Sequence, residues 1–213
     1  MLKALTLALF SFVIGCSDGR ELTPISSFGS SGGPPDPVTC PYPKGEAFFP
    51  DVGGRLPLHT FVGFPEGYNE SEIIDMESYH DCDGSRGIRA LVVDSSAVWC
   101  EACGKSSEAF SKVQYDWLGK GIHVVTLLVQ GADSQPATLK DAAEWKTKYG
   151  LTTATVVDPD MSYVGSSSSP DGMISLPVLL LVDPRTMGVV SRTEGFNGEL
   201  DPAIEDLAAA NSQ

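Results

Sequence analysis

The stretch Arg89–Cys103 reads RALVVDSSAVWCEAC and joins an apolar run to a Cys-x-x-Cys pair. The run over residues 89–94 is typical of a short buried strand. After the pair, apolar residues recur at helical spacing through Trp117, and Gly119 and Gly121 predict the end of that helix. The two cysteines are therefore expected at the start of a helix that directly follows a buried strand.

This placement would favour the thiolate form of Cys100. Unpaired backbone N–H groups and the dipole at a helix N-terminus lower a thiol pKa below its free value of about 8.5. Cys103 lies one helical turn further on and could attack a mixed disulfide formed at Cys100. Asp94 lies six residues before Cys100, at the expected strand end, where burial would raise its pKa and let it accept the Cys103 proton. The pattern predicts thiol–disulfide exchange.

The remaining pattern predicts further strands and helices in alternation. Strands are expected over 123–129, 154–157, 177–182 and 189–193, and helices over 136–149 and 201–210. Pro136 is expected to open the first of these helices. Residues 45–80, which contain several glycines and prolines, are expected to form a β-rich lead-in. The order predicts an α/β fold with a central mixed β-sheet flanked by helices and an N-terminal β-rich extension.

These positions resemble the thioredoxin superfamily over roughly residues 85–210. The resemblance rests on Asp94, on the W-C-E-A-C motif at 99–103, and on Leu176–Pro177 before an apolar strand, a hairpin and a closing helix. The exported, membrane-anchored proteins of the TlpA and ResA type are the similar branch. The resemblance implies a thioredoxin-like fold with Cys100 as nucleophile, Cys103 as resolving thiol and Asp94 as proton acceptor.

The same resemblance implies a cis Leu176–Pro177 bond beside a substrate groove, which Trp99, Glu101 and Ala102 would also line. Glu101-Ala102 stands where the family commonly has Gly-Pro, and a carboxylate beside Cys100 disfavours its thiolate. That departure favours a reductant over a strong oxidant. Ser95-Ser96 replaces an aromatic-containing pair and predicts a more polar groove. The loop over 158–175 is expected near the substrate.

The N-terminus reads as an export signal. Residues 1–15 contain a short basic start and an apolar run too short to span a bilayer as a stable helix, ending in VIGC. This resembles a bacterial lipobox, which implies a lipoprotein signal peptide cleaved before a lipidated Cys16. A plain secretory signal cut nearby is the alternative. Residues 16–39 are rich in Ser, Gly and Pro and predict a flexible tether, which leaves 40–213 as the thioredoxin-like domain.

Two other cysteines remain, Cys40 and Cys82. An even number of thiols in an oxidising compartment favours a structural disulfide between them, with two separate thiols as the alternative. The net charge of −14 disfavours nucleic acid and anionic membrane surfaces as partners. We expect a monomer held by its lipid to a bacterial membrane, with its domain in the periplasm or extracytoplasmic space. The expected partners are protein disulfides and a membrane electron donor, with no cofactor or metal.

Two alternatives stay open at this point. One is an envelope lipoprotein that binds zinc or copper through the Cys-x-x-Cys pair, for which Cys82 and His80 could complete four zinc ligands. The other is a scaffold lipoprotein in which the Cys100–Cys103 bond is static. A peroxidase fits less well, because it would want a lone reactive cysteine without an adjacent resolving partner.

Overall fold

The computed structural model of the chain describes residues 40–43, 50–165 and 172–213. The expected signal peptide (1–15), the lipidated Cys16 and the tether (16–39) lie outside the described residues. So do residue 44, residues 45–49 of the expected lead-in and residues 166–171 of the expected loop. All described residues belong to one unit, Val38–Gln213.

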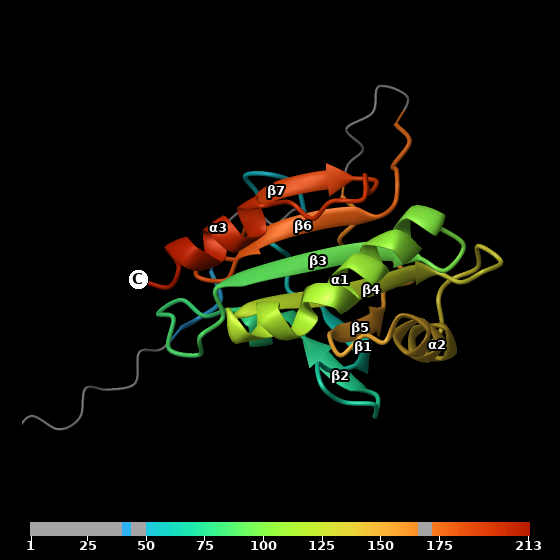
Figure 1. Ribbon diagram of the computed structural model, residues 1–213, viewed down its shortest axis with the longest axis horizontal. Coiled ribbons are helices and arrows are strands. Elements are labelled where there is room, and N and C mark those ends of the chain that lie inside the picture. The colour runs from blue at the N-terminus through green and yellow to red at the C-terminus, as the bar shows by residue number, and fades with distance from the viewer. Residues whose placement is uncertain (1–39, 44–49, 166–171) are drawn as a thin grey trace, which may run out of the picture. The chain divides into compact units, whose positions relative to one another are not determined.

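The described residues form a single mixed sheet in which β3, β4 and β5 run parallel (Figure 1). Its strands are β1 (Thr60–Phe64), β2 (Glu72–Asp75), β3 (Ala90–Ala97), β4 (Ile122–Gln130), β5 (Ala154–Val157), β6 (Val178–Asp183) and β7 (Gly188–Glu194). The order across the sheet is β2-β1-β5-β4-β3-β6-β7. The antiparallel β1 and β2 extend the sheet beyond β5, so the expected β-rich lead-in is part of the same sheet.

The central strand β3 is longer than its sequence suggests. Every residue from Ala90 to Ala97 is buried, because β4 and β6 flank the strand in the plane of the sheet and helices cover it. The expectation that the strand ends at Asp94 is wrong: Asp94, Ser95 and Ser96 all lie within it. The apolar run covers only the first part of β3. The last part buries polar side chains, which are typical of a loop when judged from sequence alone.

In the described part of the chain, three α-helices pack on the sheet: α1 (Glu101–Gly119), α2 (Leu139–Tyr149) and α3 (Ala203–Ala210). A short 3-10 helix, η1 (Met76–Tyr79), follows β2. The expectation that Pro136 opens α2 is wrong. Pro136 instead forms an isolated bridge with Gln130, and α2 begins after Thr138, whose side chain and that of Asp141 form a reciprocal capping box.

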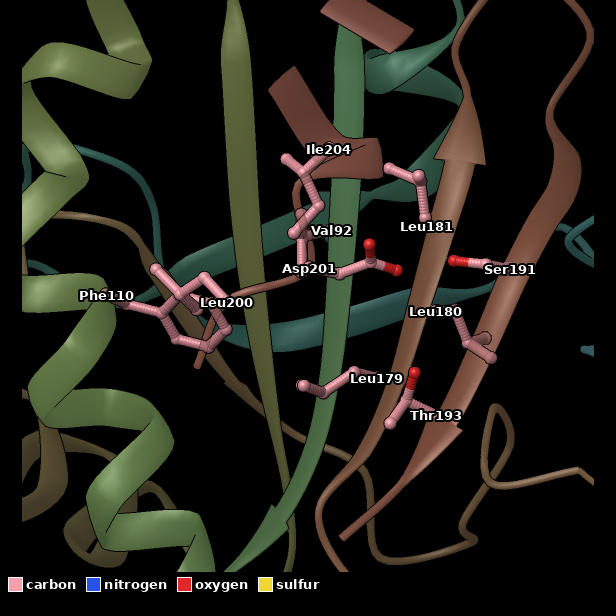
Figure 2. A pocket seen from close by; sticks show the side chains of 10 residues that line it. All are labelled: Val92, Phe110, Leu179, Leu180, Leu181, Ser191, Thr193, Leu200, Asp201 and Ile204. Atoms are coloured by element: carbon pink, nitrogen blue, oxygen red, sulfur yellow. The ribbon is translucent and has the colours of Figure 1, made fainter. Parts of the chain in front are cut away.

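Helices α1 and α3 cover the same face of β3, as Figure 1 shows. Between them and the sheet lies a cavity of about 20 Å³, lined by Val92 of β3, Phe110 of α1 and Ile204 of α3 together with residues of β6 and β7 (Figure 2). That volume suits about one water molecule. Asp94 lies two residues after Val92, so its side chain points to the face that α1 covers.

Candidate active site

The Cys-x-x-Cys pair lies at the junction between β3 and α1, as its spacing predicts. Cys100 is the N-cap of α1, and its Sγ accepts a hydrogen bond from the backbone N–H of Cys103 at 3.1 Å. The two cysteines form a disulfide with a Cα–Cα distance of 5.3 Å. Cys100 keeps 8% of its surface exposed, whereas Cys103 has none. Cys100 therefore has some surface that an incoming thiol or disulfide can contact, whereas Cys103 has none.

The segment before β6 brings a distant part of the chain to this sulfur. The Leu176–Pro177 peptide bond is cis, and the Leu176 carbonyl oxygen lies 3.6 Å from Cys100 Sγ. The backbone N–H of Gly195 donates to the carbonyl oxygens of Pro177 at 2.8 Å and Ser175 at 3.0 Å. Gly195 has a φ of 74°, a conformation that favours glycine. The backbone of Gly195, just after β7, thus holds residues 175–177, just before β6, beside Cys100.

Asp94 is fully buried in the middle of β3. Its Oδ1 accepts a hydrogen bond from the Ser96 hydroxyl at 2.7 Å, and its Oδ2 accepts one from the Thr126 hydroxyl of β4 at 3.3 Å. Burial raises the pKa of Asp94 to about 7, and the two hydroxyl groups oppose that rise. A carboxyl group with this pKa can take up and release a proton near neutral pH.

The residues between and beside the cysteines have different surroundings. Trp99 is half exposed, and its Nε1–H donates to Oε1 of Gln130 at 3.0 Å. Glu101 is exposed and pairs with Lys105 at 2.8 Å, one turn along α1, which lowers the pKa of Glu101. The carboxylate beside Cys100 is therefore ionised but accompanied by a positive charge. Ala102 is partly buried and packs against the core.

A hollow of about 390 Å³ opens directly beside Cys100. Of the expected groove residues, Trp99 and Glu101 line it; Ala102, Leu176 and Pro177 are outside its lining. Its other wall comes from Lys148 and Tyr149 at the end of α2, which sequence reasoning missed. The remaining lining residues are Val98, Gly104, Lys105 and Glu108.

Gly104 allows the close contact that forms this wall. A Cβ atom at Gly104 would lie 2.4 Å from the Tyr149 Oη, so any other residue would force the tyrosine side chain to shift. Lys148 Nζ lies 4.7 Å from the centroid of the Tyr149 ring, within the range of a cation–π interaction. A glycine in the first turn of a helix is the sequence signal that could have indicated this contact.

Contrary to expectation, Ser95 and Ser96 contribute nothing to the polarity of the groove. Both side chains are fully buried within β3, so neither can line a surface. The hydroxyl of Ser96 instead bonds Asp94, and that of Ser95 has no hydrogen-bond partner in the described part of the chain. The two serines are part of the buried surroundings of Asp94. The expectation that they line the groove is wrong because β3 extends past them.

Cys40 and Cys82 form a second disulfide with a Cα–Cα distance of 5.6 Å. Cys82 is therefore engaged and is not a free thiolate for a metal shared with Cys100. Within residues 40–43, 50–165 and 172–213, His, Cys, Asp and Glu side chains form no group of three or more that could hold a metal ion. None of the helices in these ranges is long and apolar enough to cross a lipid bilayer.

Comparison with known proteins identifies the fold. No protein-family model matches the chain, and no curated protein matches it in sequence. A thiol:disulfide interchange protein of the thioredoxin family from Chlorobium tepidum superposes with a TM-score of 0.51 at 16% identity, over 75% of this chain and 97% of that one. An uncharacterized conserved protein from Geobacillus kaustophilus gives 0.56 at 14% identity, over 80% and 88%.

A reduced 2-Cys peroxiredoxin from Plasmodium vivax gives a TM-score of 0.52 at 12% identity, over 76% of this chain and 96% of that one. These identities are too low to transfer an activity, and the matched proteins differ in the chemistry that their names state. What they share with this chain is the arrangement of sheet and helices. The chain therefore has a thioredoxin-like α/β fold, with a Cys-x-x-Cys pair at the start of α1.

Proposed function

We propose that the chain is a thiol–disulfide oxidoreductase that reduces protein disulfides through Cys100 and Cys103. One observation carries the proposal: Cys100, at a helix N-terminus, keeps 8% of its surface exposed and lines the adjacent hollow, while its partner Cys103 is fully buried. This asymmetry separates a sulfur that meets the substrate from one that resolves the intermediate. The buried Asp94, with a pKa of about 7, supports the proposal because it supplies a proton acceptor within the same face of the fold.

The reaction starts from the reduced dithiol. The Cys100 thiolate attacks one sulfur of the substrate disulfide, which forms a mixed disulfide and releases the other substrate sulfur as a thiolate that takes a proton from water. Cys103 then gives its proton to the Asp94 carboxylate and attacks the Cys100 sulfur. The second substrate thiolate leaves, and the protein holds the Cys100–Cys103 disulfide. Two electrons have passed to the substrate, and an external dithiol donor must return them.

The surroundings of Cys100 support the reducing direction. Strong oxidants of this chemistry owe their potential to a strongly stabilised thiolate. Here Cys100 Sγ accepts one backbone N–H bond, and the negative end of the Leu176 carbonyl lies 3.6 Å away. The nearby Lys105 is already paired with Glu101. These features offer the thiolate limited stabilisation beyond that of the helix terminus, which favours a low reduction potential.

The proposal includes an envelope location. Residues 1–15 would serve as a lipoprotein signal, Cys16 as the lipidated residue and residues 16–39 as the tether to a domain that starts near residue 40. The Cys40–Cys82 disulfide supports this location, since structural disulfides persist in exported proteins. A membrane electron donor is the proposed source of reducing equivalents. Incorporation of labelled fatty acid into the expressed chain, and its loss in Cys16→Ser, tests the anchor.

Turnover tests the activity. The full chain is given a synthetic disulfide-bonded peptide and a dithiol reductant, and the rate of peptide reduction is measured. Cys100→Ser should abolish the catalysed rate, whereas the double variant Cys40→Ala/Cys82→Ala should retain it at a temperature where it is folded. The absence of any wild-type rate would favour the static-scaffold alternative. An equal rate in Cys100→Ser would overturn the assignment of the nucleophile.

A further inference from the structure

Both oxygens of the buried Asp94 carboxyl group accept a hydrogen bond from a side-chain hydroxyl. Ser96 lies two residues along β3 and so shares a face of the sheet with Asp94, and Thr126 lies directly opposite Asp94 on β4. The Ser96 bond is 2.7 Å and the Thr126 bond 3.3 Å, and all three side chains are fully buried. Strand register alone therefore builds this three-residue arrangement.

The two bonds are unequal. A distance of 2.7 Å is typical of an O–H···O hydrogen bond, whereas 3.3 Å is beyond the usual range. Hydrogen bonds to an ionised carboxylate are roughly twice as strong as those between neutral groups, so they favour the charged form. Of the two donors, the Ser96 hydroxyl therefore contributes more to keeping Asp94 ionised.

We propose that Ser96 is a positioning residue for the proton transfer from Cys103 to Asp94, because its hydroxyl holds the buried carboxyl group in the ionised form that accepts the proton. This inference rests on the proposed function, in which Asp94 is that acceptor. A serine that only filled space in a buried strand would have no effect on the charge of Asp94.

The other described neighbours of Asp94 carry no charge that would keep its carboxyl group ionised. On β6 the residue paired with Asp94 is Leu179, which carries no charge. On α1 the titratable groups near the helix start are Cys100 and Cys103, which titrate only when reduced, and the paired Glu101 and Lys105 on the surface. Among described residues, no charged side chain contributes to the shift of the Asp94 pKa, which burial raises and the two hydroxyls oppose.

The expected effect follows from the protonation equilibrium. Loss of the Ser96 hydroxyl removes a bond that only the carboxylate fully uses, so the pKa of Asp94 should rise further above 7. A charge-assisted hydrogen bond is strong enough to move a pKa by about one unit. Such a shift lowers the ionised fraction at pH 7 about fivefold, and the resolving step should slow by about the same factor.

The adjacent Ser95 provides a matched control. It is also fully buried in β3, and its hydroxyl has no hydrogen-bond partner among the described residues. As the next residue along the strand, it points to the opposite face of the sheet. Ser95→Ala therefore removes an equally buried hydroxyl without removing a bond to Asp94. Ser96→Thr keeps the hydroxyl and serves as the conservative rescue.

The deciding experiment titrates Asp94 directly in the full chain, by ¹³C NMR of its side-chain carboxyl group, in the wild type and the three variants. We expect Ser96→Ala to raise the pKa by about one unit, Ser96→Thr to restore it and Ser95→Ala to leave it unchanged. The pH profile of peptide disulfide reduction should move with the NMR value. If Ser96→Ala does not fold, Ser96→Val, which has the shape of Ser96→Thr without the hydroxyl, is expected to give a rise in the same direction.

The role of Ser96 and the proposed function are tested by different outcomes. Equal titration of Asp94 in Ser96→Ala and Ser95→Ala overturns the inference, as does a shifted NMR titration with an unmoved pH profile. An absent effect in Ser96→Val, where it replaces Ser96→Ala, overturns it as well. A wild type without turnover overturns the proposed function, while the NMR titration still decides whether Ser96 controls the charge of Asp94.

Discussion

Replacement of Asp94 by Asn should change how the stability of the protein depends on pH. The folded chain raises the pKa of Asp94 from 3.8 to about 7 because the group is buried. Between these values the folded state binds a proton that the unfolded state has lost, so the free energy of unfolding falls as pH rises through this window. Above pH 7 the folded protein carries an ionised buried carboxylate, and the loss is complete.

The magnitude follows from the two pKa values. Each unit of difference corresponds to about 1.4 kcal/mol. Between pH 5 and pH 8 the wild type should therefore lose about 3 kcal/mol more than Asp94→Asn. Asparagine has a similar shape, can still accept a hydrogen bond from Ser96 and does not ionise.

Urea unfolding of the oxidised protein at pH 5, 6, 7 and 8 measures this difference, because the disulfide keeps both active-site cysteines from titrating. The exposed Asp160→Asn is the matched control and should follow the wild type at every pH. Parallel stability curves for the wild type and Asp94→Asn would refute the reasoning, since they would mean that burial does not shift the Asp94 pKa.

Three further outcomes are expected. Cys103→Ser should accumulate a mixed disulfide between Cys100 and the substrate peptide, detectable by mass spectrometry as the added peptide mass; accumulation on Cys103 in Cys100→Ser would contradict the assigned roles. Cys40→Ala/Cys82→Ala, which removes the second disulfide, should lower the free energy of unfolding by about 4 kcal/mol, because the bond closes a loop with a sequence separation of 42 residues. A loss below about 1 kcal/mol in urea unfolding would count against this entropic cause. Gly104→Ala should destabilise the protein by about 1–2 kcal/mol because its Cβ meets the Tyr149 hydroxyl, and most of this loss should disappear in a Tyr149→Phe background; an equal loss in both backgrounds would place the strain elsewhere.

The main elements of the fold follow from local sequence patterns. The buried strands, the helix after the Cys-x-x-Cys pair and the closing helix are marked by apolar runs and helical spacing, and the structure places them close to the expected bounds. The start of α2 is harder to predict from sequence. Pro136 is a strong helix-start signal, but here it forms an isolated bridge with Gln130. The capping box at Thr138 and Asp141 is the better local signal.

The site shows where sequence patterns stop being informative. The spacing of Asp94, Cys100 and Cys103 indicates a redox site, but the role of Ser96 depends on which strand lies next to β3 and in which register. Polar residues in the second half of β3 read as loop, because their burial is provided by β4, β6 and α1. The wall formed by Lys148 and Tyr149 likewise depends on the packing of α2 against Gly104.

The reduction potential of the Cys100–Cys103 couple tests the central claim most directly. The full chain is equilibrated with dithiothreitol or glutathione buffers of known potential, and the fraction of oxidised pair is read by thiol labelling and mass spectrometry. We expect a potential near that of thioredoxin, about −270 mV. A value near −120 mV would contradict the reducing direction, and a pair that cycles in no buffer would contradict the redox function itself.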